Sequence, residues 1–166
     1  MAFKEPSRLD VLLTLLVQRT FLRSSYRGYI DRLGLRGDER VLDFGSGSGF
    51  AARYIADKPV SGNGRVTCVD VCEVWMRVAQ KTLRKYPNVD FKLGEISTLD
   101  IDDGSHDVVF IHFVIHDIDQ DLRPHIIEQL ARNLVDGGKL HIREPLGRHG
   151  MSVETIRELM ADHGLE

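Results

Sequence analysis

The feature that most constrains the fold of this chain is a glycine-rich turn directly after a short apolar run. Residues 40–44 read Arg-Val-Leu-Asp-Phe, and glycines then occupy every second position at 45, 47 and 49. Such a run is typical of a strand buried on both faces. Glycine accepts positive φ and leaves no side chain between the main chain and a ligand. With a helix predicted over 50–57, the segment indicates a strand, a ligand-facing turn and a helix.

The rest of the chain repeats this alternation of strand and helix. Strands are predicted over 65–70, 89–93, 106–112 and 139–143, the last after a turn at 136–138. Helices are predicted over 73–86, with Val74, Val78 and Leu83 facing inward, over 122–134, and over 152–163, where Ser152 is the N-cap. Strands that alternate with helices predict an α/β fold with a doubly wound parallel sheet and helices on both faces.

The N-terminal segment has apolar residues at helical spacing from Leu9 to Ile30. We expect a helix to start at Pro6-Ser7, a break at Ser24-Ser25 or Gly28, and an end near Gly34. The run over 11–17 is too short to span a bilayer and predicts a helix that buries most of its surface. The chain is predicted to be one domain, with a helical segment over 1–36 and an α/β core over 37–166.

Composition excludes several classes of protein. The chain has 166 residues and a net charge of -3, so no global positive field attracts it to nucleic acid or anionic membranes. Its two cysteines, Cys68 and Cys72, are too few for a disulfide framework or a four-ligand zinc site. The start lacks the apolar core of a signal peptide. We therefore predict a cytoplasmic protein with no metal site and no nucleic-acid or membrane partner.

The spacing of the glycines also limits which ligands the turn can bind. It departs from the G-x-G-x-x-G of nicotinamide-binding proteins, and no phosphate-binding G-x-x-x-x-G-K-[ST] occurs. The stretch over 41–50 resembles motif I of class I S-adenosylmethionine-dependent methyltransferases. This resemblance implies S-adenosyl-L-methionine as the cofactor, and it assigns to the cofactor site Asp43, Gly45, Ser46, Gly47, Gly49 and Phe50.

Two further positions match the family. Asp70 ends the second predicted strand, 25 residues after Gly45. The resemblance places its carboxylate on the ribose hydroxyls, with Val71 beside it; the alternative is an N-cap for the following helix. Leu-Gly-Glu-Ile over 93–96 matches the family's acidic position near the adenine amino group, which implies contacts from Glu95 and Ile96. Glu95 replaces the family's shorter Asp, and an exposed loop carboxylate is an equal alternative.

The end of the fourth predicted strand, Phe-Ile-His-Phe-Val-Ile-His-Asp over 110–117, is similar to members that act on small molecules. The resemblance implies that His112 borders the cofactor. Histidine is a common proton acceptor near neutral pH, so His116 is the candidate catalytic base, with Asp117 and Glu144 as others at this edge and a packing role as the alternative. No Asn-Pro-Pro-Tyr or Asp-Pro-Pro-Tyr motif of the DNA amino-group methylases is present.

The resemblance covers residues 36 to 146 and departs from the family in two places. The chain stops where a sixth strand would begin, so the fifth strand is expected to leave an open sheet edge, through which a homodimer could form. The N-terminal helical segment lies in a region that varies in the family and often covers the substrate as a lid.

Together these features predict a Rossmann-like sheet in the order 3-2-1-4-5, with the N-terminal helices near the cofactor. The predicted function is S-adenosylmethionine-dependent methyl transfer to a small-molecule acceptor. One alternative is a non-catalytic S-adenosylmethionine-binding module or subunit of a larger assembly. A second is a nicotinamide-dependent oxidoreductase. The position of Phe50, where that fingerprint has Gly or Ala, argues against the latter.

Overall fold

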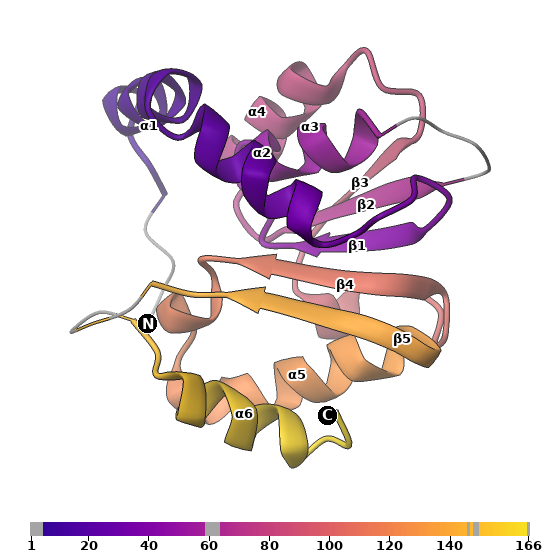
Figure 1. Ribbon diagram of the computed structural model, residues 1–166. Helices are drawn as coiled ribbons and strands as arrows, with labels where there is room; N and C mark the ends of the chain where they lie inside the picture. Colours follow the sequence, from indigo (N-terminus) through magenta and orange to yellow (C-terminus); the bar gives the residue numbers. More distant parts are fainter. Residues whose placement is uncertain (1–4, 59–63, 146, 148–149, 166) are drawn as a thin grey trace.

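Five parallel strands form one sheet in the order β3-β2-β1-β4-β5, which confirms the predicted order. The structure, a computed structural model, describes residues 5–58, 64–145, 147 and 150–165 (Figure 1). Part of the predicted turn over 59–64 therefore lies outside the described residues. The strands are β1 (Arg40–Phe44), β2 (Arg65–Asp70), β3 (Val89–Leu93), β4 (His106–His112) and β5 (Leu134–Arg143).

Helices cover both faces of the sheet (Figure 1). Alternate strand residues face opposite layers, so Val41 packs among α2 (Arg23–Arg32), α3 (Phe50–Ala56) and α4 (Glu73–Leu83). Its neighbour Leu42 packs on the other side, where α5 (Arg123–Arg132) and α6 (Val153–Ala161) lie. Three short 3₁₀ helices complete the described elements: η1 (Ile96–Thr98), η2 (Ile115–Asp117) and η3 (Gln120–Leu122).

The first helix, α1 (Arg8–Thr20), contradicts the prediction that it buries most of its surface. None of its residues is buried, and Leu12 and Leu16 are 64% and 55% exposed. Figure 1 shows the reason: α2, α3 and α4 already cover this face of the sheet, and α1 projects beyond them. No helix among the described residues is long and apolar enough to cross a membrane.

The break between α1 and α2 also differs from the prediction. Ser7 caps α1 as expected, but the break falls at Phe21-Leu22 rather than at Ser24-Ser25 or Gly28. The N–H groups of Phe21 and Leu22 both donate to the Val17 carbonyl, which ends α1, and the Leu22 carbonyl then starts α2. The two serines occupy the first turn of α2, where serine is well tolerated.

Helix α4 and strand β5 depart most from their predicted limits, while α3, α5 and α6 differ by one or two residues at their ends. Helix α4 ends at Leu83 rather than at residue 86, and it buries Met76 and Ala79 while Val74 and Val78 are half-buried. Strand β5 already begins at Leu134, because the predicted turn over 136–138 is held within the sheet as an irregularity between the pairs His106–Leu134 and Val108–Lys139.

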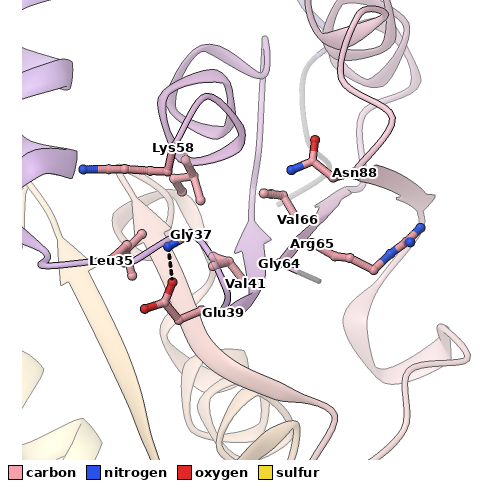
Figure 2. A pocket seen from close by; sticks show the side chains of 10 residues that line it. Leu35, Gly37, Glu39, Val41, Lys58, Gly64, Arg65, Val66 and Asn88 are labelled. Atoms are coloured by element: carbon pink, nitrogen blue, oxygen red, sulfur yellow. Dashed lines mark hydrogen bonds between the residues drawn. The ribbon is translucent and has the colours of Figure 1, made fainter. Parts of the chain in front are cut away.

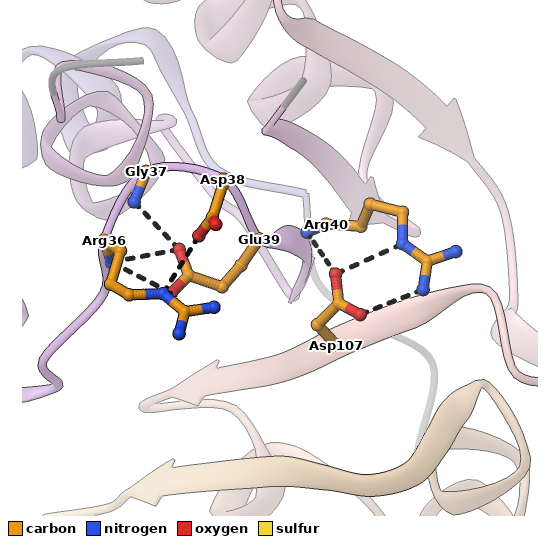
Figure 3. A network of polar contacts seen from close by, with 6 residues as sticks. All are labelled: Arg36, Gly37, Asp38, Glu39, Arg40 and Asp107. Carbon is orange, nitrogen blue, oxygen red and sulfur yellow. Dashed lines mark hydrogen bonds and ion pairs between the residues drawn. The ribbon is translucent and has the colours of Figure 1, made fainter. Parts of the chain in front are cut away.

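The amino ends of the strands are closed by polar contacts. Figure 3 shows the Glu39 carboxylate accepting hydrogen bonds from the N–H groups of Arg36 and Gly37, both at 2.9 Å. The Asp107 carboxylate accepts from the main chain and guanidinium of Arg40. The cavity between these ends has a volume of about 10 Å³, and Leu35 and Val41 contribute to its lining (Figure 2). Such a volume holds about one water molecule, so this cavity, as the described residues line it, has no space for a larger ligand.

Candidate functional site

The glycine turn after β1 has the conformation that its sequence predicts. Gly45, Gly47 and Gly49 have φ values of 71°, 53° and 72°. A Cβ atom on Gly45 would lie 2.4 Å from Val114 Cγ2, and one on Gly49 would lie 2.8 Å from Leu83 Cδ1. A Cβ atom on Gly47 would meet nothing closer than the Gly45 carbonyl oxygen at 4.0 Å. The outer glycines thus permit close packing, and the middle one borders open space.

Asp70, at the end of β2, ties the glycine turn to the neighbouring strand. One carboxylate oxygen accepts from the Gly47 N–H at 2.7 Å and the other from the Cys72 N–H at 2.8 Å. Burial raises the pKa of Asp70, and the hydrogen bonds from the Cys72 and Gly47 main chain oppose that shift. The carboxylate therefore lies beside the turn, and its contact with the ribose hydroxyls stays a prediction.

A cavity of about 390 Å³ opens at the carboxyl ends of the strands. This volume lies in the range of small-molecule sites. Its lining includes Trp75 of α4 and Phe113 after β4. The structure brings six of the predicted cofactor residues to its wall, namely Gly45, Gly47, Asp70, Val71, Glu95 and Ile96.

Four other predicted residues, Asp43, Ser46, Gly49 and Phe50, are not among those that line the cavity. Asp43 and Ser46 are buried, and among the described residues neither Asp43 Oδ2 nor Ser46 Oγ has a hydrogen-bond partner. Burial, followed by the charge of Asp70, raises the pKa of Asp43 to about 7. Buried polar atoms normally have partners, so these two fit a site that a polar ligand or water completes.

His112 lies in an aromatic group rather than on the cavity wall. Its ring centroid is 4.6 Å from that of Tyr26 and 4.2 Å from that of Phe113. Burial, with a smaller effect of the nearby Arg143 charge, lowers the pKa of His112 to about 4. The ring is therefore neutral at physiological pH.

His116, the candidate base, is held by Glu144, which the sequence indicated only as another candidate base. Glu144, directly after β5, has a fully buried side chain. One of its oxygens accepts from the N–H groups of Val114 and Ile115 at 2.9 and 2.8 Å, and the other lies 2.5 Å from His116 Nδ1. Like His112, His116 is not among the cavity-lining residues. The signal for Glu144 was its position at the carboxyl end of a strand next to β4.

Comparison with known proteins identifies the family. The model of a methyltransferase domain matches residues 41–138. An uncharacterized 37.1 kDa protein in a transposon of Streptomyces fradiae is 32% identical over 85% of this chain and 39% of its own length. An arsenite methyltransferase of Halobacterium salinarum is 33% identical over 64% of this chain and 27% of its own length. A demethylmenaquinone methyltransferase of Beutenbergia cavernae is 29% identical over 71% of this chain and 45% of its own length.

Solved structures share the fold. A SAM-dependent methyltransferase from Aquifex aeolicus superposes with a TM-score of 0.71 at 23% identity, over 84% of this chain and 78% of that one. A TehB-like SAM-dependent methyltransferase from Corynebacterium glutamicum has a TM-score of 0.68 at 17% identity, over 90% of this chain and 80% of that one.

The chain spans less than half of the length of the three curated relatives named above. The family model nevertheless covers the glycine turn, the strand that carries Asp70 and the strand that precedes His116. Because this match exceeds half of the chain, the protein belongs to the class I S-adenosylmethionine-dependent methyltransferase family.

Proposed function

We propose that this domain binds S-adenosylmethionine in the cavity at the carboxyl edge and transfers its methyl group to a small molecule. The observation that carries the proposal is the cavity of about 390 Å³ walled by the glycine turn and Asp70. The relatives named as arsenite and demethylmenaquinone methyltransferases support the reaction class and differ in acceptor. The relatives therefore do not identify the individual compound that this chain methylates.

The residues on the cavity wall fit the cofactor. Each Asp70 oxygen accepts one main-chain N–H, and a carboxylate has about four lone-pair positions, so it can also accept from ribose hydroxyls. The exposed carboxylate of Glu95 would accept from the adenine amino group, with Val71 and Ile96 as apolar neighbours. Gly49 and Phe50 would support the turn without direct contact, and the unpaired atoms of Asp43 and Ser46 would bond to the cofactor or a water molecule. His112 would border the cofactor from outside the cavity wall.

When bound, the cofactor supplies an activated sulfonium methyl group, so the protein mainly aligns the reactants. A base is needed only where the acceptor must lose a proton. We assign this role to His116. Glu144 binds its Nδ1, which leaves Nε2, 3.4 Å from Asp117 Oδ1, to accept the proton. Asp117 lines the cavity, so the turn that carries His116 borders it.

The cofactor proposal is tested by titrating S-adenosylmethionine and S-adenosylhomocysteine into the protein. Trp75 is the single tryptophan and lines the cavity, so its fluorescence reports binding beside calorimetry. We expect Asp70→Ala to weaken binding by about tenfold to a hundredfold, because a charged hydrogen-bond acceptor is lost. Asp90→Ala removes an exposed aspartate from the neighbouring strand and should leave binding unchanged. No binding by a folded wild-type chain would refute the cofactor site.

Catalysis is tested by the formation of S-adenosylhomocysteine with a panel of small acceptors. For an acceptor that loses a proton, His116→Asn should lower kcat by about a hundredfold while cofactor affinity stays constant, as removal of a general base does. Cofactor binding without product from any acceptor would instead favour the alternative, a non-catalytic binding module.

Residues 1–36 are proposed to act as a lid on the core formed by 37–166. The support is a hydrogen bond of 2.7 Å from the Ser48 hydroxyl in the glycine turn to the side-chain carbonyl of Gln18 in α1. We expect S-adenosylhomocysteine to slow hydrogen exchange in α1. Unchanged exchange in α1, with slower exchange in the glycine turn, would contradict the lid.

The outer strand β5 supports a homodimer. Its one partner strand among the described residues is β4, so its other edge has main-chain groups available for pairing. We propose that two copies associate through this edge. Light scattering should then give twice the chain mass of 18.8 kDa, and a mass of one chain would contradict the proposal.

The cytoplasmic location stays a prediction.

A further inference from the structure

A second group of side chains lies at the carboxyl edge beside the cavity, and Phe113 is the one member that also lines it. Arg143, the last residue of β5, has its guanidinium carbon 4.7 Å from the ring centre of Tyr29 and 5.3 Å from that of Phe113. In the part of the chain that the structure describes, no carboxylate forms an ion pair with Arg143. Its N–H groups can therefore bind an anion while its faces lie on aromatic rings.

His112 provides a second, independent sign of a binding site. Its ring stacks with those of Phe113 and Tyr29, at 4.2 and 5.7 Å between centroids. His112 Nε2 is buried and has no hydrogen-bond partner among the described residues. The neutral ring does not repel Arg143, and the unpaired nitrogen can receive or donate a hydrogen bond to a ligand atom.

Phe113 joins this group to the cofactor cavity. It is the one non-glycine residue of the described chain with positive φ, 62°, and its N–H donates to the Arg143 carbonyl at 2.8 Å. A bulky side chain in this conformation is strained, and such strain gathers at functional sites. The ring is 39% exposed, lines the cavity and stacks on His112. A molecule held at Arg143 would thus lie next to the cofactor cavity.

We propose that Tyr29, His112, Phe113 and Arg143, the Arg143 cluster, form the acceptor site, and that it takes a planar acceptor carrying a carboxylate or phosphate group. The guanidinium fork matches the two oxygens of such an anion, and the rings match a planar body. This inference rests on the proposed function, because it assigns the cluster to the acceptor of the same methyl transfer.

The probes are benzoate, phenyl phosphate and the neutral benzyl alcohol, each titrated by calorimetry into protein saturated with S-adenosylhomocysteine at low ionic strength. We expect both anions to bind about tenfold or more tighter than benzyl alcohol, since an arginine pair to a carboxylate or phosphate is a strong hydrogen-bonded contact. Tighter binding of benzoate identifies a carboxylate acceptor, and tighter binding of phenyl phosphate identifies a phosphate acceptor.

Two substitutions and one control locate the binding. Arg143→Gln should weaken both anions about tenfold or more, and Arg143→Lys should weaken them less, because it keeps the charge without the fork. Lys139→Gln removes the same charge from an exposed position on the same strand and should change neither. Circular dichroism checks that each variant is folded, and Arg143→Lys keeps the test valid where Arg143→Gln unfolds.

Two results would overturn the inference. One is that neither anion binds to the wild type, and the other is that the anions bind equally well to the wild type and to both Arg143 variants. The titration of S-adenosylhomocysteine alone separates this failure from failure of the proposed function. Normal binding of S-adenosylhomocysteine without Arg143-dependent anion binding refutes the acceptor site and leaves the cofactor site intact. No binding of S-adenosylhomocysteine refutes the proposed function, and the acceptor assignment with it.

Discussion

The two edges of the sheet are built from the same five strands, yet they differ in the size of the cavity at each and in the contacts beside it. At the amino edge, Glu39 binds main-chain N–H groups beside a cavity of about 10 Å³, and Arg40 binds Asp107 (Figures 2 and 3). At the carboxyl edge, Asp43 and His112 have buried atoms without partners in the described chain, beside a cavity of about 390 Å³.

The difference follows from the direction of the strands. All five run parallel, so their carboxyl ends meet at one edge, where the turns lead toward the next helices. Unpaired buried groups and positive φ at Phe113 are unfavourable in the unliganded fold. Tyr54, His141 and His163 also have buried atoms without partners among the described residues, but the strained Phe113 and the cavity of about 390 Å³ lie together at the carboxyl edge. This combination indicates that the carboxyl edge is shaped for ligands.

The largest effect is expected where the carboxyl edge is most tightly packed. Gly45→Ala places a Cβ atom 2.4 Å from Val114 Cγ2 and keeps an unfavourable φ, so we expect it to lower the free energy of unfolding by about 2–4 kcal/mol. Gly47→Ala is the matched control, because its Cβ atom meets nothing closer than 4.0 Å. It should cost about 1 kcal/mol, the penalty of positive φ, and mainly weaken cofactor binding. Urea unfolding and calorimetry measure both; equal stability losses would contradict the packing argument.

The next effect concerns pH. The pKa of Asp43 is about 7 in the folded state and about 4 in an unfolded chain, so the folded state binds the proton more tightly. This stabilisation is fully present below pH 4 and is lost as pH rises to about 7. The wild type should therefore lose about 2–3 kcal/mol between pH 5 and pH 8 that Asp43→Asn does not lose. Parallel pH profiles of the two unfolding free energies would show that Asp43 is not the titrating group.

A smaller loss is expected at Glu144, which organises the turn after β4. Glu144→Ala leaves the N–H groups of Val114 and Ile115 without their acceptor and should lower stability by about 2 kcal/mol. Glu144→Gln keeps an oxygen for these groups and should cost less. Urea unfolding compares the two, and a Gln variant as unstable as the Ala variant would show that the charge, rather than the two hydrogen bonds, holds the turn.

The smallest effect is expected at the amino edge. Arg65 and Asp90 pair at 2.9 Å, with side chains 55% and 51% exposed. Solvent screens such a pair, so Arg65→Ala should change stability by less than about 1 kcal/mol and leave cofactor affinity unchanged. A clear loss of cofactor affinity, measured by calorimetry, would show that the two edges are coupled and would contradict their separate roles.

Most of the core was predictable because its signals are local. The limits of β1, β2, β3 and β4 match the predicted ranges, and the glycine turn has the positive φ values that its composition indicated. The part of the candidate site from Gly45 to Asp70 could be predicted from the spacing of the motifs. The contact between Glu144 and His116 could not, because these residues are 28 positions apart and meet only through the pairing of β4 with β5.

Local sequence is sufficient to specify the order of strands and helices along the chain and the glycine turn, because hydrophobic period and backbone freedom are properties of neighbouring residues. Tertiary structure decided that α1 is exposed, because whether an apolar face finds a partner depends on what already covers the sheet. It also decided that His112 stacks with Tyr29 and that Arg143 lies over the same ring. Those contacts arise only where β4, β5 and α2 meet, and no single segment encodes that meeting.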